Sequence, residues 1–270
     1  MNLTSADYVR HLEEESARFA AVLEPLAGDE AVPTCPDWSA DDLLWHLAEV
    51  QWFWSTIVRD GLTGPQAEAA KPPRPSGHAE LAGFFRRSHA ELVRVLAGHD
   101  PADPAWTWSD DQTVGFVQRR QTLEALIHRV DAEIAAGDRT HLDPRLSTDG
   151  IDEALRIMYG SGPDWGAFTA DPIDEVGLLR IRTTDTGSSW LVRTGIFTGT
   201  DPGSGVHYPH EPMINVAAVD RDEPAAATIS GRAEDLDCWL WNRPSVGPVD
   251  QAGDAASLER FQAVISAGIN

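Results

Sequence analysis

The stretch that decides the fold is Thr113–Ala136, TVGFVQRRQTLEALIHRVDAEIAA. It contains no proline and its only glycine, Gly115, lies near its start, so it can form a helix of about six turns, roughly 35 Å long. Glu124 and His128 are four residues apart, so both side chains leave the same face of that helix. A carboxylate and an imidazole placed in this way can bind one metal ion, although a structural hydrogen bond is the commoner use of this spacing.

Three earlier segments have the apolar periodicity of helices, namely residues 5–27, 40–58 and 79–97. With the opening stretch they predict a four-helix bundle, for which we expect up-down-up-down order. The Pro- and Gly-rich connection at 61–77 is longer than the usual loop, which is typical of a lid or a site wall.

A second histidine, His46, lies in the 40–58 segment, whose other residues are apolar almost all round. Residues around Glu124 and His128 are apolar as well, and buried polar groups need partners. Because facing helices of a bundle often build metal sites, we predict that His46, Glu124 and His128 bind one divalent cation. This set suits Zn²⁺ with an open fourth position, and it also suits Fe²⁺, Mn²⁺ or Ni²⁺.

The composition changes after Gly137, and the rest of the chain predicts a small α+β unit with an antiparallel sheet. Strands are expected at 176–184, 189–197 and 225–230, with another around 213–219, and helices at 149–158, 234–241 and 257–267. Residues 160–172 are expected to form a loop. The predicted fold class is therefore α+β, with a helical-bundle domain over residues 1–150 and an α+β domain over 151–270.

The chain is strongly acidic, since its 270 residues include 21 Lys+Arg and 43 Asp+Glu, and 21 − 43 = −22. This balance argues against nucleic acid or an anionic membrane as a partner, and an anionic substrate would need a local arginine. No signal peptide and no membrane-spanning run is visible. The two cysteines, Cys35 and Cys238, make no disulfide framework and are expected to be buried filler. We therefore expect a cytoplasmic protein.

Three motifs resemble those of the mycothiol-dependent maleylpyruvate isomerase family. Residues 34–53, TCPDWSADDLLWHLAEVQWF, resemble its PDW…H signature, and residues 123–133, LEALIHRVDAE, match its E-x3-HR-x-D-x-E pattern. Residues 227–245, ATISGRAEDLDCWLWNRPS, resemble its C-terminal domain. The resemblance implies a DinB-like four-helix bundle followed by a small α+β domain related to sterol-carrier-like folds.

The resemblance also implies the chemistry. In such proteins the metal is bound by the histidine after PDW and by the Glu and His of E-x3-H, which are His46, Glu124 and His128 here. The cofactor would be mycothiol, whose sulfur takes the open zinc position and becomes a nucleophilic thiolate. That thiolate could add to a cis double bond, allow rotation and leave, as in isomerisation of maleylpyruvate. The thiolate could instead stay attached to a small electrophile, which is S-transfer. We rank S-transfer slightly above isomerisation, because the family is large and no residue in this sequence indicates the substrate.

Further residues receive roles from the same resemblance. Arg243, the arginine of W-L-x-x-R, would anchor an anionic substrate; the alternative is a surface arginine paired with a nearby carboxylate. Arg129 and Asp131 are expected to orient His128 or to lock the helix as a supporting pair.

Two other function classes compete with the enzyme hypothesis. One is a metal-binding or thiol-binding protein without turnover, such as a sensor or a sequestering protein. The other is a metal-dependent hydrolase, for which Glu49, one turn after His46, is the candidate general base. His207 and His210 are expected to be exposed loop residues rather than a second metal site. The expected partners are a small thiol and a small electrophilic or anionic substrate, and the choice between monomer and homodimer is left open.

Overall fold

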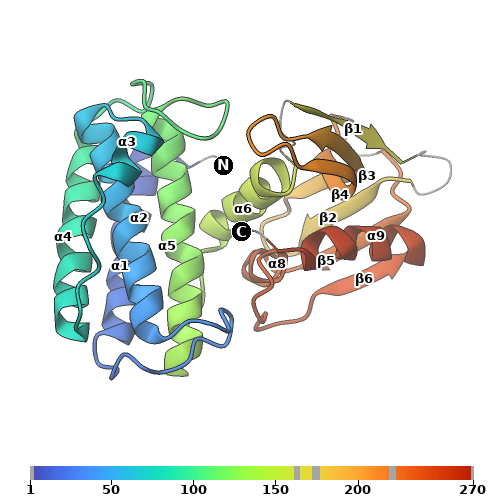
Figure 1. Ribbon diagram of the computed structural model, residues 1–270. Coiled ribbons are helices and arrows are strands. Elements are labelled where there is room, and N and C mark those ends of the chain that lie inside the picture. Colours follow the sequence, from blue (N-terminus) through green and yellow to red (C-terminus); the bar gives the residue numbers. More distant parts are fainter. Residues whose placement is uncertain (1–2, 161–164, 172–176, 219–222, 269–270) are drawn as a thin grey trace. The chain divides into compact units, whose positions relative to one another are not determined.

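The computed structural model describes residues 3–160, 165–171, 177–218 and 223–268. The chain forms two compact units, residues 1–140 and 141–270, which are drawn with their helices and strands in Figure 1. The boundary between the two units therefore lies before the helix at 144–153. The sequence suggested a boundary after residue 150. The described residues contain no helix that is both long and apolar enough to cross a membrane.

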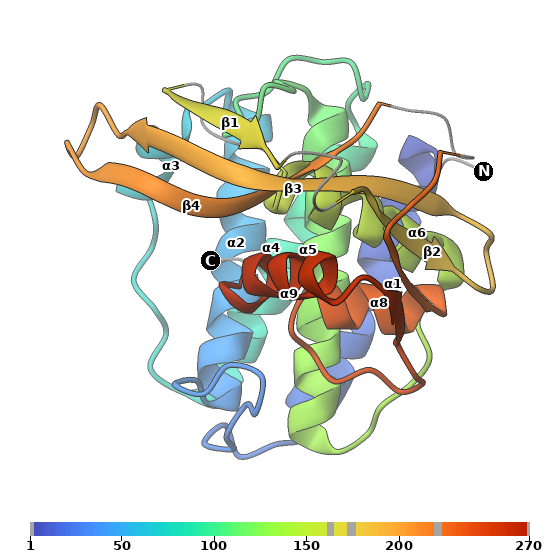
Figure 2. The same cartoon turned by 90° about the vertical axis from the view of Figure 1, so that its right-hand side faces the viewer.

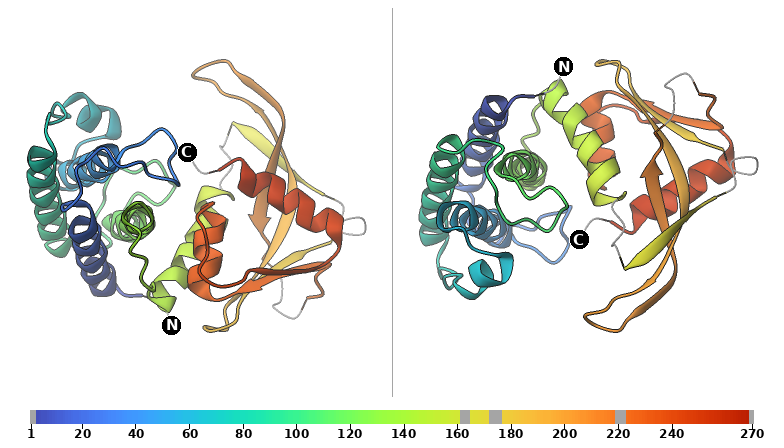
Figure 3. Two further views of the ribbon diagram at one scale, coloured as in Figure 1. Left: turned by 90° about the horizontal axis from the view of Figure 1, so that it is seen from below. Right: turned by 90° about the horizontal axis from the view of Figure 1, so that it is seen from above.

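The first unit contains the four predicted long helices and one short helix. These are α1 (Ser5–Leu23), α2 (Ala40–Asp60), α3 (Gly64–Ala69), α4 (His78–Ala97) and α5 (Val114–Ala136). Thr4 and Ser39 begin α1 and α2 with capping boxes, in which each side chain accepts from a backbone N–H that the helix leaves unpaired. The views in Figure 3 show the long helices side by side, and most residues of α5 are buried.

The order of the helices differs from the expected up-down-up-down bundle. His78, the first residue of α4, lies 2.5 Å from a carboxylate oxygen of Asp41 at the start of α2, and 3.2 Å from the carbonyl of Glu24 at the end of α1. Helices α2 and α4 therefore run parallel to each other, and the expected order is wrong. Two parallel helices in sequence need a connection that returns along the bundle, and residues 61–77 provide it (Figure 1). This crossover accounts for the length of that segment.

Helices α1 and α5 also run parallel, and buried polar contacts set their register. The hydroxyl of Thr122 donates to the carbonyl of Tyr8 near the start of α1, and Arg129 donates to Glu15 farther along. Arg129 Nε also donates to Glu133 at 3.1 Å. Glu15 and Glu133 are buried, so Arg129 neutralises carboxylates that burial would otherwise make costly.

The second unit is a six-stranded sheet with helices packed on it. The strands are β1 (Gly166–Ala170), β2 (Leu179–Thr183), β3 (Ser189–Thr200), β4 (His207–Val216), β5 (Ala227–Gly231) and β6 (Asp250–Gly253). The order is β1-β3-β2-β5-β6, with β4 paired to β3. Among the described strands, only β2 and β5 pair in parallel. Figure 2 shows β3 and β4 as a long antiparallel ribbon with β1 beside β3.

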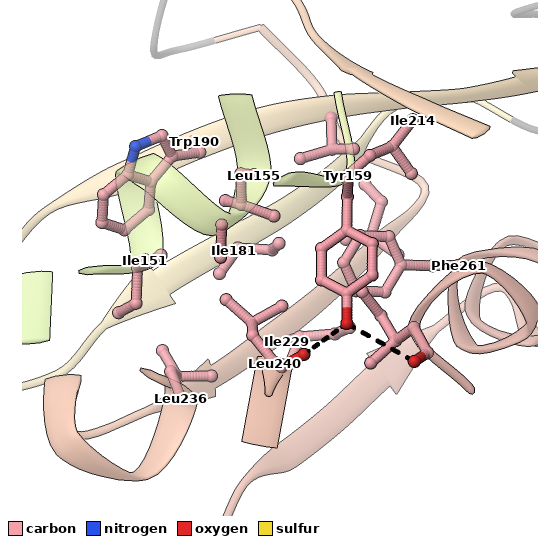
Figure 4. Close-up of a cluster of buried hydrophobic side chains, with 14 of the residues drawn as sticks. Ile151, Leu155, Tyr159, Ile181, Trp190, Ile214, Ile229, Leu236, Leu240 and Phe261 are labelled. Carbon is pink, nitrogen blue, oxygen red and sulfur yellow. Dashed lines mark hydrogen bonds between the residues drawn. The ribbon is translucent and has the colours of Figure 1, made fainter. Parts of the chain in front are cut away.

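The helices of this unit are α6 (Pro144–Glu153), its π-helical continuation η1 (Ala154–Met158), α8 (Ala233–Leu240) and α9 (Ala255–Ser266). They share one apolar core with one face of the sheet (Figure 4). Members of that core from the three helices include Ile151, Leu236 and Phe261. The phenol of Tyr159 lies inside it and donates to the carbonyl of Leu240 at 2.6 Å.

Two strands were not predicted, and one of them lies in a segment that was expected to be a loop. The β1 strand lies in the segment 160–172, which we expected to be a loop. In this strand Gly166 packs directly against the ring of Phe197. The strand is held by backbone pairing to β3 and has no apolar alternation that the sequence could reveal. The four residues of β6 are all exposed. His207 and His210 are exposed as expected, but they belong to β4 rather than to a loop. Its two prolines fit an edge strand, because an edge leaves one side without ladder hydrogen bonds.

Candidate metal centre

The three residues predicted as metal ligands lie together. His46 comes from α2 and Glu124 and His128 from α5, and one ligand atom of each lies within 4.8 Å of the other two. Glu124 Oε1 is 3.2 Å from His46 Nε2 and 3.1 Å from His128 Nε2. A single carboxylate oxygen thus faces two imidazole nitrogens.

Local sequence and helix packing together bring these side chains to one place. The four-residue spacing stacks Glu124 and His128 on one face of α5. His46 lies two turns into α2, whose start Ser39 fixes through its cap. The antiparallel contact of α2 with α5 then sets His46 opposite that face.

Asp131 orients the His128 ring. Its Oδ2 lies 3.0 Å from His128 Nδ1, and its Oδ1 accepts from the hydroxyl of Thr34 at 2.6 Å. Asp131 is fully buried, so the carboxylate holds a fixed position. With the Nδ1 proton donated to Asp131, a neutral His128 presents the lone pair of Nε2 to Glu124. Two lone pairs facing each other at about 3 Å need a cation or a proton between them.

The ring of Trp38 borders both histidines. Its centroid lies 4.9 Å from that of His46 and 6.3 Å from that of His128. The two imidazole rings are themselves 4.7 Å apart, edge to face. The tryptophan of the PDW signature therefore forms one side of the centre and restricts the rotation of both imidazole rings.

The charges at the centre favour a cation. Burial by itself would raise the pKa of Glu124, but the Arg120 guanidinium and the two histidines hold that pKa well below its usual value. Burial would lower the pKa of His128, but its contacts with Asp131 and Glu124 outweigh burial and raise it to about 9. The metal-free site thus keeps a proton on His128 at neutral pH, in a place where a metal ion would supply the positive charge instead.

The donor set fits a tetrahedral divalent cation. Ligand atoms about 2.0–2.1 Å from a zinc ion at tetrahedral angles are about 3.3 Å apart. The two measured separations, 3.2 and 3.1 Å, are close to this value. The outer hydrogen bond from His128 to a carboxylate is the arrangement that ligating histidines usually have. The His46 side chain is 27% exposed, which leaves one side of the set accessible.

Arg129 and Asp131, which were expected to act as a supporting pair, make separate contacts. Asp131 orients His128, whereas Arg129 reaches away from the centre to Glu15, Glu133 and Thr140. Asp131 therefore has the expected orienting role, and Arg129 has the expected role of fixing α5 in the bundle.

Glu49 and the two cysteines lie outside this set of three side chains. Glu49 lies 3.2 Å from the ammonium of Lys71 in the crossover segment, an ion pair that occupies the carboxylate proposed as a hydrolytic base. Cys35 is partly buried and packs against the core between α1, α2 and α4, and Cys238 is fully buried, as expected for filler.

Arg243 lies three residues after the last residue of α8, and its backbone is fixed by a helix-terminating turn. The Arg243 N–H donates to the carbonyl of Cys238 at 2.8 Å, and the Asn242 N–H donates to that of Trp239 at 3.0 Å. Asn242 has φ of 57°, a left-handed conformation that asparagine tolerates better than most residues. The Arg243 guanidinium donates to the carbonyl of Trp241 at 2.7 Å.

Sequence reasoning missed the role of Arg120, whose guanidinium donates to Glu124 Oε2 at 2.7 Å. The signal was present, because Arg120 precedes Glu124 by the same four-residue spacing that joins Glu124 to His128. It also missed Thr34, the first residue of the PDW signature segment, whose contact with Asp131 depends on the path of the connection between α1 and α2.

The fold and the site define an α+β protein in which a helical bundle holds a histidine–carboxylate centre. Two family models match this chain: the mycothiol maleylpyruvate isomerase N-terminal domain over residues 9–133 and the C-terminal domain of the same family over residues 145–260. The chain belongs to the mycothiol-dependent maleylpyruvate isomerase family, which is a family of enzymes.

Solved structures show the same fold. The mycothiol-dependent maleylpyruvate isomerase aligns with a TM-score of 0.57 and 14% identity, over 94% of this chain and 95% of that chain. A histidine-to-alanine mutant of that enzyme aligns over the same shares with a TM-score of 0.57 and 13% identity. A search of curated proteins finds no match.

Proposed function

We propose that this chain is a mycothiol-dependent enzyme in which His46, Glu124 and His128 hold a catalytic divalent cation, with zinc as the first candidate. The observation that carries the proposal is the convergence of two imidazole nitrogens on one carboxylate oxygen, at 3.2 and 3.1 Å. A bound cation would lower the pKa of a coordinating thiol, so that a thiolate is present near neutral pH. Family membership supplies mycothiol as the thiol.

The chain's own residues prepare this site in three ways. Asp131 and Thr34 fix the ring of His128, so that Nε2 rather than Nδ1 faces the cation position. The Trp38 ring lies beside both imidazoles and limits their rotation. Partial exposure of His46 leaves room for a fourth ligand from outside.

The proposed reaction is addition of the thiolate to a small electrophile. With a cis alkene conjugated to a carbonyl, addition leaves a single bond that can rotate, and elimination returns the trans alkene and the thiol. With another electrophile the sulfur stays attached, which is S-transfer. The family name favours the isomerisation of a maleylpyruvate-like substrate as the first reaction to test.

A direct experiment separates these reactions from binding without turnover. Zinc-loaded protein is mixed with mycothiol and either maleylpyruvate or a chlorinated aromatic electrophile, and both cis–trans conversion and thiol loss are followed. We expect one of the two above background, and loss of that activity by at least a hundredfold in Glu124→Gln and His46→Ala. His99→Ala, a histidine at the exposed end of α4, is the matched control. Thiol binding with neither reaction would refute the enzymatic proposal and leave a thiol-binding protein.

Arg243 is proposed as the anchor for an anionic substrate. Removing one charged hydrogen-bonding partner of a carboxylate costs about 1.5–3 kcal/mol, so Arg243→Ala should raise KM for maleylpyruvate at least tenfold. The KM for an uncharged electrophile should change little. Arg260→Ala, which removes an exposed arginine paired with Asp171, is the control. Equal effects on charged and uncharged substrates would show that Arg243 has no anchoring role.

A further inference from the structure

Arg120 borders the candidate metal centre, where a positive charge is unexpected. Its side chain is only 4% exposed and lies one helical turn before Glu124 on α5. A guanidinium that is taken out of water needs a carboxylate partner, and a divalent cation nearby would repel it. A structural ion pair alone would be easier to place away from such a site, so the position of Arg120 calls for a reason connected with the centre.

The two oxygens of Glu124 have different partners. Oε2 accepts from Arg120 at 2.7 Å, a short charge-assisted hydrogen bond. Oε1 faces His46 and His128 at 3.2 and 3.1 Å. Because Arg120 engages Oε2 while Oε1 faces the two histidines, the geometry favours binding of a cation through Oε1 alone. A glutamate free to use both oxygens would fill one more coordination position.

Arg120 also sets the charge of the centre. Glu124 and Asp131 contribute −2, Arg120 contributes +1 and a divalent cation +2, which gives −2 + 1 + 2 = +1 for the named groups. One anionic ligand then makes the sum zero. Without Arg120 the sum is already zero before that ligand arrives, and a bound thiolate would leave a net charge of −1.

We propose that Arg120 is a positioning residue that makes Glu124 a one-oxygen ligand and biases the open position toward an anionic fourth ligand, the thiolate. This inference rests on the proposed metal centre and deepens it. It assigns to Arg120 no contact with substrate or with the reacting atoms.

Cobalt substitution gives a readout that a purely structural role would not change. Co²⁺ is loaded into the wild type, Arg120→Met and Arg120→Lys, and visible spectra are recorded before and during titration with mycothiol. Four-coordinate Co²⁺ absorbs more strongly than Co²⁺ with additional ligands. We expect Arg120→Met to lose band intensity before thiol is added and to bind mycothiol about ten- to hundredfold more weakly. Arg120→Lys keeps the charge and should restore most of the thiol affinity.

Arg86→Met is the control, because it removes one exposed arginine from α4 and changes the net charge equally. Circular dichroism checks that each variant is folded; if Arg120→Met is not, Arg120→Gln serves as the second charge-free variant. Wild-type spectra and thiol affinity in a folded charge-free variant would overturn the inference. Failure of the wild type to bind Co²⁺ would overturn the metal centre with it. Wild type that binds Co²⁺ but not mycothiol would refute the proposed cofactor, while the thiol-free spectra would still decide the one-oxygen role.

Discussion

Asp131 shows how much of the centre depends on a residue that is not a candidate ligand. It is buried, accepts from Thr34 and fixes the ring of His128. Without a metal, it also helps to keep His128 protonated well above the usual pH range for histidine. The same carboxylate therefore prepares a ligand for the metal and stabilises the metal-free fold through a charge pair.

This pair predicts a pH dependence for the metal-free protein. The pKa of folded His128 is raised from 6.5 to about 9, so its contribution to stability is complete below pH 6.5 and is lost as the pH rises through about 9. The free energy of unfolding should therefore fall across this window. Asp131→Asn should flatten the fall, because the amide carries no charge. Urea denaturation at several pH values in the presence of a chelator measures both.

Asp138→Asn is the matched control, since Asp138 is exposed and contacts Arg18 instead. A slope between pH 6.5 and 9 that is the same in Asp131→Asn and the wild type would contradict this account of His128.

At the scale of elements, α5 holds the molecule's first unit together. One face presents Glu124 and His128 to α2, and another presents Arg129 and Glu133 to α1. The helix is buried around most of its circumference, and several of its buried polar side chains have partners on neighbouring helices. Polar residues on so central a helix therefore mark either the metal centre or the register of the bundle.

The Arg129 network predicts a large loss of stability. Arg129→Met would leave the buried carboxylate of Glu15 without its guanidinium partner and would remove one of the two guanidinium partners of Glu133, at a cost of about 3–5 kcal/mol. The double variant Arg129→Met, Glu15→Gln should recover part of this loss, because one of the two carboxylates is removed as well. Chemical denaturation of the metal-free protein measures the difference. A single variant as stable as the wild type would mean that the network carries little of the α1–α5 contact.

At the scale of the whole chain, every residue of the candidate centre belongs to the first unit. The three proposed ligands, together with Thr34, Trp38, Arg120 and Asp131, lie within residues 1–140. The second unit has its own apolar core and its own sheet. Metal binding and any contribution of Arg243 to substrate binding therefore belong to different units.

This division predicts that residues 1–140 expressed alone bind one zinc ion per chain. The measurement is metal content after dialysis, with Glu124→Gln in the same fragment as the control. A fragment that is helical by circular dichroism but takes up no zinc would show that the centre depends on the second unit.

The sequence by itself determined the fold class, the four long helices, most of the strands and the choice of His46, Glu124 and His128. The elements follow from periodicity and capping residues, and Glu124 and His128 from their four-residue spacing, which are local properties of the chain. His46 was chosen as a polar residue in an apolar helix segment and from the family resemblance. The strands β1 and β6 could not be predicted from the sequence, because backbone pairing to β3 and β5 stabilises them and neither has an apolar alternation of its own.

Only the tertiary structure decided how those elements combine. The parallel pairing of α2 with α4 depends on where the crossover returns, and no local pattern encodes that path. The meeting of His46 with Glu124 and His128, and the division of Glu124 between Arg120 and the histidines, depend on how α2 packs against α5 and on which rotamers fit there. Spacing along one helix fixes which side chains share a face, whereas contacts between residues far apart in sequence form only when the packed core sets the distance between helices.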